Sequence, residues 1–201
     1  VLDLAVRGML VPQDPEEGSA AELLNQIFKE KEKLVKKKNI KKPKYFDELL
    51  PEEEPFLIPS KWKWSRLGTI CTKITDGSHN PPPDSGKGYP MLSSQNIYFG
   101  EIDFSSPSRY LNEKDFVSED KRTVIKPFDV LLNIVGSIGR SAVVPLNAPK
   151  FALQRSVAVL SSSLDPYYLS MVLTSSLCSS YFATHAKGTA QKGIYLGKLS
   201  L

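Results

Sequence analysis

Apolar side chains in the first part of the chain recur at helical spacing. Residues 1–9 predict a short helix that ends in a left-handed turn at Gly8. A second helix is predicted over residues 19–38, where apolar residues form one stripe among Lys and Glu. Its start carries a capping box, in which the Ser19 hydroxyl accepts from the Glu22 amide and the Glu22 carboxylate reaches back. We expect this helix to bury its stripe against another part of the chain.

Beyond residue 58 the pattern changes to short strand-like runs. Strand or buried-turn character is expected at residues 62–64, 67–72, 89–94, 97–102 and 151–161. The clearest core signal is residues 129–144, where DVLLNIV and RSAVV flank GSIG and predict two strands around a glycine-bounded turn. Residues 105–120 are polar and irregular, and Asp165-Pro166 predicts the start of a helix over residues 167–183. Because no strict β-α-β repetition is present, the predicted fold class is α+β, or mixed α/β.

An acidic, proline-rich stretch separates the two patterns. Residues 43–59 place three consecutive glutamates between prolines, which is typical of a linker. We therefore predict a boundary near residue 58, with a helical segment and linker at residues 1–58 and the main domain at residues 59–201. The chain opens on Val1 in a helical pattern, so we expect a trimmed N-terminus.

Composition indicates the class of protein, and the distribution of charge indicates the kind of partner. The 201 residues are 41% hydrophobic and 24% charged, and no apolar run is long enough for a bilayer, so a cytosolic protein without a membrane partner is expected. Residues 1–58 hold 10 Lys and Arg against 12 Asp and Glu, whereas residues 59–201 hold 16 against 10. This surplus favours an anionic partner such as nucleic acid, although proteins that bind none also carry it. The basic residues 36–44 are either a solvated helix end or a phosphate-contacting patch.

The sequence contains no self-contained active site. It has no metal-binding His-Glu-Xaa-Xaa-His or Cys-Xaa-Xaa-Cys spacing, and Cys71 and Cys178 are too widely separated to indicate a disulfide framework or a zinc site. GSIGR lacks the lysine of a phosphate-binding loop, and Asn80-Pro-Pro is followed by proline rather than the aromatic residue of an adenine methyltransferase. We therefore expect no catalytic residue, no metal and no cofactor in this chain.

Residues 74–83, ITDGSHNPPP, form the most unusual loop. Asp76-Gly77 is a turn pair, and three prolines stiffen the exit. The loop is either a stiffened connection or a recognition loop.

Several loops carry the side-chain types that read base edges, namely Arg or Lys for guanine, Asn or Gln for adenine, and short hydroxyl donors. The candidates are Thr75, Ser78, His79, Asn80, Ser93, Ser94, Gln95, Asn96, Arg109, Arg140, Gln154, Arg155, Lys187, Thr189, Gln191 and Lys192. Gln154 and Arg155 interrupt a strand-like run, so these two long polar side chains either leave the sheet or pair inside it.

Four stretches of the chain resemble the specificity subunits of type I restriction-modification enzymes. They are residues 2–24, 58–71 and 74–83, and the block 129–143 taken together with residues 187–198. In this family LDLAVRGKLVPQD precedes a charged helix and a target-recognition domain, and Met9 here replaces the usual lysine. The family pattern TDGxHxxP falls on Thr75, Asp76, Gly77 and His79, which adds Asp76 and Gly77 to the DNA-binding candidates.

The resemblance implies that residues from about 59 onward are one target-recognition domain and that residues 1–58 belong to a helical scaffold. In the family, each subunit has two such domains, and each domain reads one half of a split DNA sequence. The subunit itself is not catalytic. Methylation with S-adenosylmethionine belongs to the modification subunits, and ATP- and Mg-dependent translocation and cleavage belong to the restriction subunit. The expected partners are double-stranded DNA, the modification subunits and, through the complex, the restriction subunit.

Two other hypotheses remain at this point. In the first, the chain is a subunit-assembly scaffold with only non-specific DNA contacts, and the helix at residues 19–38 is its functional element, with self-association through helices as a further option. In the second, the chain is an autonomous methyltransferase or nuclease, for which no catalytic motif is present.

Overall fold

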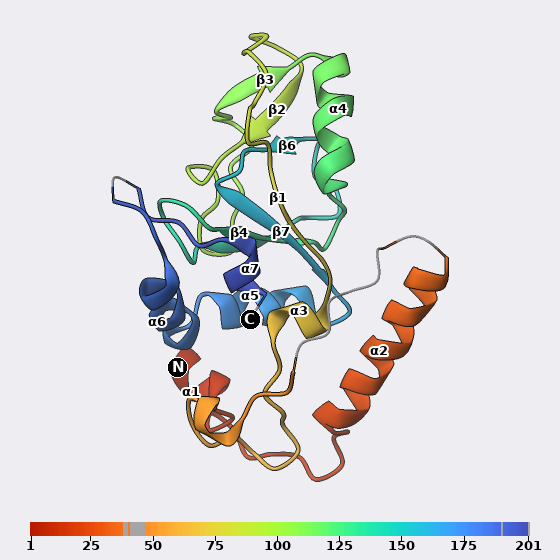
Figure 1. Cartoon of the computed structure of the whole chain (residues 1–201), viewed down its shortest axis with the longest axis vertical. Coiled ribbons are helices and arrows are strands. Elements are labelled where there is room, and N and C mark those ends of the chain that lie inside the picture. The colour runs from red at the N-terminus through yellow and green to blue at the C-terminus, as the bar shows by residue number, and fades with distance from the viewer. Residues whose placement is uncertain (38–39, 41–46, 190, 201) are drawn as a thin grey trace.

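A four-stranded antiparallel sheet forms the centre of the main domain (Figure 1). The computed structural model describes residues 1–37, 40, 47–189 and 191–200. The strands of this sheet, in spatial order, are β1 (Cys71–Asp76), β7 (Val157–Ser162), β4 (Val130–Asn133) and β5 (Ser141–Val143). Side chains of β4 alternate between two apolar clusters: Val130 and Leu132 enter one, and Leu131 enters the other. Because β4 is buried on both faces, it reads as a continuous apolar run in the sequence.

A smaller sheet covers one face of the central sheet. It consists of β3 (Arg109–Leu111), β2 (Tyr89–Leu92) and β6 (Ala152–Leu153), with β2 and β6 parallel. Leu92 and Leu153 pack with Leu131 between the two sheets. Helix α4 (Glu113–Thr123) lies against this smaller sheet, where the Phe116 ring stacks on the Tyr89 ring at 4.2 Å between centroids.

Helices cover the other face of the central sheet. They are α3 (Leu67–Ile70), α5 (Pro166–Leu173), α6 (Ser176–His185) and α7 (Leu196–Leu199). Their buried residues Leu169, Leu173, Phe182 and Leu199 share one cluster with β4. The main domain is therefore an α+β fold, as the sequence predicted.

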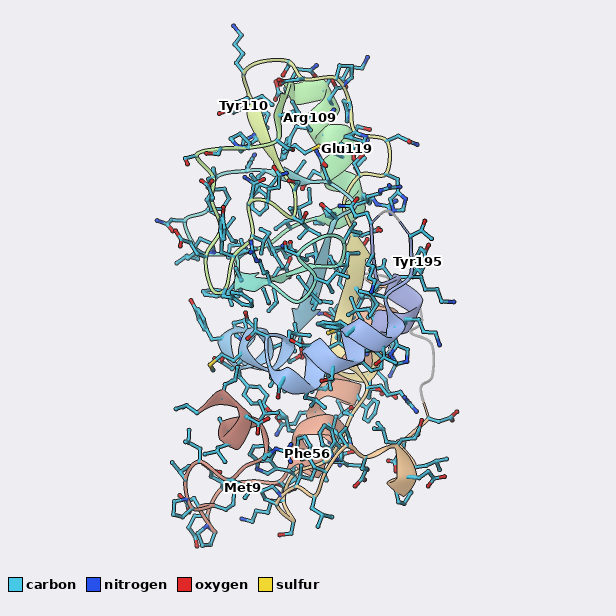
Figure 2. The ribbon with its side chains drawn as sticks, turned by 90° about the vertical axis from the view of Figure 1, so that its left-hand side faces the viewer. Met9, Phe56, Arg109, Tyr110, Glu119 and Tyr195 are labelled. Atoms are coloured by element: carbon cyan, nitrogen blue, oxygen red, sulfur yellow. The ribbon has the colours of Figure 1, made fainter. Side chains whose placement is uncertain are left out.

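The N-terminal segment lies beyond these helices. It contains α1 (Leu2–Val6), α2 (Ala20–Lys36) and the 3-10 turn η1 (Pro51–Glu53). Figure 2 shows Met9 and Phe56 below the crossing helices, at the end of the molecule opposite Arg109. Helix α2 lies to one side (Figure 1) and is held by the buried Lys31, whose Nζ donates to the carbonyls of Gly68 (2.9 Å) and Thr69 (2.8 Å).

Several sequence predictions are confirmed by the structure. Both capping-box hydrogen bonds of α2 are present: the Glu22 amide donates to Ser19 Oγ at 3.3 Å, and the Ser19 amide donates to Glu22 Oε2 at 2.9 Å. The short first helix, the two strands around GSIG and the helix start at Asp165 are also present.

Within the described part of the chain, no helix is both long and apolar enough to cross a bilayer.

Other predictions of local structure are wrong. No strand forms at residues 62–64, and residues 97–102 form a turn closed by one bridge between Ile97 and Ile102. The stretch 105–120, predicted to be irregular, contains β3 and most of α4. The single strand predicted over residues 151–161 is two strands, β6 and β7, in different sheets. The predicted helix 167–183 is broken into α5 and α6 by the cap residue Ser175.

The predicted boundary near residue 58 and the alternatives for the basic run at residues 36–44 stay predictions. Lys36 and Lys37 are exposed at the end of α2, whereas Lys38, Lys41, Lys42 and Lys44 lie outside the described residues.

Candidate nucleic-acid interface

Three loops meet at one end of the central sheet. Because neighbouring strands are antiparallel, β1 and β4 finish at the end where β7 and β5 begin. Asp76 is opposite Ala158, and Asn133 is opposite Val157. The loops 76–80, 134–140 and 153–156 are therefore neighbours, although they are far apart in the sequence.

Ser156, in the loop 153–156, is bonded both to the loop 134–140 and to the loop that follows β2. Its carbonyl accepts from the amides of Ile134 (2.9 Å) and Val135 (3.3 Å), and its hydroxyl accepts from the amide of Ser94 (3.0 Å). The Ser94 carbonyl also accepts from the side-chain amide of the buried Asn133 at 2.8 Å. The loop after β2, residues 93–97, is thus fixed at the same sheet end.

The loop 76–80 is bonded directly to the loop 153–156. The Ser78 amide donates to the Leu153 carbonyl at 2.7 Å, and the Arg155 amide donates to the Ser78 carbonyl at 2.9 Å. Gly77 permits this approach, because a Cβ at that position would lie 2.1 Å from the Leu153 carbonyl oxygen. The DG turn and the QR pair of the sequence are therefore parts of one structure.

A buried carboxylate orients His79. Asp76 Oδ2 accepts from His79 Nε2 at 2.8 Å, and Asp76 Oδ1 accepts from Arg122 Nη2 at 2.5 Å. Arg122 Nε also donates to the Asp76 carbonyl at 2.9 Å. The Asp76 side chain is almost fully buried, whereas His79 is half exposed. Asp76 thus positions the histidine and has little surface of its own to offer a ligand.

The last loop, residues 187–193, joins the same end of the sheet. Lys187 and Gly193 exchange two backbone hydrogen bonds of 2.8 and 2.9 Å, and the Gly136 amide donates to the Lys192 carbonyl at 3.3 Å. The Ile194 amide donates to the Ile134 carbonyl at 2.8 Å. Lys187 and Lys192 are exposed on this loop.

The predicted site residues divide into exposed and structural groups. Those with exposed side chains in the converging loops are His79, Asn80, Gln95, Arg155, Lys187, Thr189, Gln191 and Lys192. Those that are buried or bonded within the fold are Asp76, Gly77, Ser78, Ser93 and Asn96. The side-chain nitrogen Nδ2 of Asn96 donates to the Ser106 carbonyl at 2.7 Å. Thr75 and Ser94 are half-buried, Thr75 within β1. Among the described residues, the guanidinium of Arg155 makes no hydrogen bond or ion pair.

Three further predicted residues make specific contacts. Arg109 Nη1 donates to the Pro82 carbonyl at 2.6 Å and so anchors the exit of the proline loop. Figure 2 shows Arg109 in the upper part of the molecule, away from Tyr195 beside the C-terminal helices, so the structure does not bring Arg109 to the last loop. Gln154 Nε2 donates to Ser108 Oγ at 2.9 Å. The Arg140 guanidinium lies over the Tyr98 ring, with its carbon 5.5 Å from the ring centroid.

Sequence reasoning missed Arg122, Asn133 and Ser156. Arg122 lies near the end of α4, just beyond the stretch 105–120 that was predicted to be irregular, and its partner Asp76 is 46 positions away. Asn133 ends the buried run VLLN, where a polar residue in an apolar run was a usable signal of a tertiary bond. Its Oδ1 is buried without a hydrogen-bond partner among the described residues.

No group of three or more His, Cys, Asp or Glu side chains suited to a metal occurs in the part of the chain that the structure describes.

Comparison with known proteins identifies the family. The chain is 34% identical over 134 residues to the type I restriction enzyme EcoAI specificity subunit of Escherichia coli, and 49% identical over 72 residues to the EcoEI specificity subunit of the same organism. The chain is homologous to the specificity subunits of type I restriction enzymes. These matches cover 67% and 36% of this chain but 22% and 12% of the relatives, so the chain spans less than a quarter of either specificity subunit. No protein-family model matches the chain.

Solved specificity subunits are distant from this chain. The S subunit from M. genitalium has a TM-score of 0.43 and 13% identity, with 68% of this chain and 32% of that chain covered. The HsdS subunit from Thermoanaerobacter tengcongensis has a TM-score of 0.38 and 20% identity, with 76% and 35% covered. At these TM-scores the identification rests on the sequence relatives.

Proposed function

We propose that this specificity-subunit homologue contains a DNA target-recognition domain that reads one half of a bipartite target. The observation that supports the proposal most is the convergence of separate loops at one sheet end, where backbone hydrogen bonds hold exposed Arg, Lys, Gln and His side chains. Rigid loops with such donors are suited to a DNA groove, because Lys and Arg hold phosphates while Arg, Gln and Asn side chains discriminate base edges.

Arg155 is the best candidate for a base contact. Its amide is bonded to Ser78, and the neighbouring Gln154 amide donates to the Leu92 carbonyl at 2.9 Å, so the backbone around it is fixed. Its side chain is exposed. A fixed backbone with an unengaged guanidinium suits bidentate binding to guanine, since little conformational freedom of the main chain is lost on binding.

We further propose that the chain directs catalytic partners and performs no chemistry itself. S-adenosylmethionine would bind to the modification subunits, and ATP and Mg would bind to the restriction subunit. The named relatives are specificity subunits of restriction enzymes, which supports this assignment by family.

The decisive experiment selects DNA from a randomised duplex library at low salt, with and without modification subunits, and compares wild type with Arg155→Ala and Arg155→Lys. Wild type should enrich a short motif. Arg155→Ala should lose about 5- to 150-fold in affinity for the enriched motif and little for random DNA, because one bidentate contact discriminates by roughly 1–3 kcal/mol.

Arg155→Lys is the matched control, since it keeps the charge but not the two-pronged donor geometry. It should retain the salt dependence of binding and lose most of the base discrimination. Equal losses on motif and random DNA for both variants would contradict a base-reading role for Arg155.

The assembly-scaffold hypothesis is supported by a separate observation. Helix α2 carries Leu23 and Phe28, which are 40% and 48% exposed, and an apolar cavity of about 610 Å³ lies between α2 and helices α5 and α6. Both features are suited to helix–helix contacts with another subunit. If the chain is only a scaffold, no motif will be enriched even with modification subunits present, while Leu23→Lys with Phe28→Lys will abolish their co-purification.

A further inference from the structure

Two aromatic side chains project from a tight turn at the candidate interface. Residues 97–102 form this turn, which is closed by the bridge between Ile97 and Ile102 and by a 2.9 Å hydrogen bond from the Tyr98 amide to the Glu101 carbonyl. Gly100 occupies the left-handed region with φ +81°, where a larger residue would be strained. Tyr98 is 42% exposed and Phe99 is 68% exposed.

The turn is attached to the sheet end where the candidate loops converge. The Gly100 amide donates to the carbonyl of Ser141 at 2.8 Å, and Ser141 is the first residue of β5. The Asn133 side-chain amide donates to the Ile97 carbonyl at 3.3 Å. The tip of the turn therefore has a fixed position relative to the loops that carry Arg155 and Lys192.

Packing does not explain these rings. Backbone hydrogen bonds and Gly100 define the turn, and Ile97 is its buried apolar residue, so Phe99 contributes little to the core. Because this phenyl ring is exposed on a rigid tip, most of its apolar surface is still available for a ligand to bury. Burial would be favourable by roughly 25 cal/mol for each Å² removed from water. Such a ring is suited to a ligand that covers it.

The charge beside the rings favours an anionic ligand. The guanidinium carbon of Arg140 lies 5.5 Å from the centroid of Tyr98 and 6.0 Å from that of Phe99. Exposed Lys187, Lys192 and Arg155 lie on the adjoining loops. A cation next to aromatic faces matches a nucleic acid, in which the phosphate pairs with the cation and the base stacks on the ring.

We propose that the Tyr98–Phe99 turn is a DNA-contacting element, in which Phe99 stacks on or wedges beside a base while Arg140 holds the adjacent phosphate. This inference rests on the proposed function and deepens it. A wedge at a base step reads how readily that step unstacks, so it adds selectivity for deformable steps to the hydrogen-bond readout of Arg155.

The test compares the full chain with Phe99→Ala and Phe99→Trp on the duplex enriched by wild type, with single 2-aminopurine substitutions scanned along it. Phe99→Ala should weaken binding by about 5- to 150-fold, the range expected for one stacked base, and Phe99→Trp should restore it. The salt dependence should not change for Phe99→Ala, because a phenyl ring displaces no counterion. One 2-aminopurine position should brighten with wild type and stay dark with Phe99→Ala.

Tyr167→Ala is the matched control, because Tyr167 is 57% exposed and follows the finish of β7, at the other end of the central sheet. It should bind as wild type does. If wild type binds DNA and Phe99→Ala binds within twofold of it, the inference is overturned while the proposed function stands. If Phe99→Ala instead loses only the modification subunits, the turn is a protein contact and the inference is likewise overturned. If wild type enriches no DNA, the proposed function fails and the inference fails with it.

Discussion

Replacing Gly77 by alanine tests whether close approach of two loops builds the interface. The new Cβ would lie 2.1 Å from the Leu153 carbonyl oxygen and 2.5 Å from that of Gln154, and both are backbone atoms. Contacts of a real Cβ are essentially never shorter than 3.0 Å, so the two loops must separate by about 1 Å.

The separation removes hydrogen bonds whose lengths are known. The bonds that join the loops run from Ser78 N to Leu153 O (2.7 Å), from Arg155 N to Ser78 O (2.9 Å) and from Gly77 N to Val157 O (3.2 Å). Lengthened by about 1 Å, each exceeds the roughly 3.2 Å limit of a good N–H···O bond. At about 0.5–1.5 kcal/mol each, Gly77→Ala should lower the free energy of unfolding by roughly 1.5–4.5 kcal/mol.

Urea denaturation followed by circular dichroism measures this loss, and library selection measures the accompanying loss of motif enrichment. Gly197→Ala is the matched control, because Gly197 is in α7 and nothing lies within 4 Å of the position that its new methyl group would take. That change should leave stability equal or slightly raised, by up to about 1 kcal/mol. A Gly77→Ala protein as stable as wild type, with unchanged DNA selection, would show that the close approach of the loops does not build the interface.

Two further predictions concern buried polar groups. Asp76→Asn should lower the free energy of unfolding, measured by urea denaturation, by roughly 1–3 kcal/mol and should weaken motif binding, because the new amide cannot accept from both Arg122 and His79. Glu52→Gln is the control, because Glu52 is exposed. Equal effects of the two changes would count against a positioning role for Asp76. Burial raises the pKa of Cys71 from 9.0 to about 12, so the buried neutral thiol stabilises the fold fully below pH 9 and progressively less toward pH 12. Between pH 8 and pH 10 the free energy of unfolding of wild type should therefore fall by about 1.4 kcal/mol more than that of Cys71→Ala. If the free energies of unfolding of the two proteins change with pH in parallel, Cys71 makes no such contribution.

Local chemistry in the sequence was sufficient for some elements. The Ser19–Glu22 capping box and the glycine-bounded turn between β4 and β5 depend on residues within a few positions of one another, and both are present in the structure. Amphipathic spacing likewise predicted α2, and the mixture of patterns predicted an α+β class. The loop 76–80 was recognisable as unusual because its turn pair and prolines are adjacent in the chain.

Long-range pairing produced what spacing along the chain did not reveal. The run 151–161 looked like one strand, but Gln154 and Arg155 leave the smaller sheet and turn toward Ser78 before β7 enters the central sheet. Arg122 became part of the site only because α4 brings it to Asp76. The exposed turn at Phe99 was likewise invisible, since exposure depends on what the rest of the chain fails to cover.

Caps, turns, apolar stripes and the family were thus readable from the chain alone, because these follow from neighbouring residues. Which loops share one sheet end, and which of their side chains face outward, became visible in the folded molecule. Antiparallel pairing of β1, β7, β4 and β5 sets that arrangement, and the free energy of such pairing depends on packing between distant segments rather than on local preference.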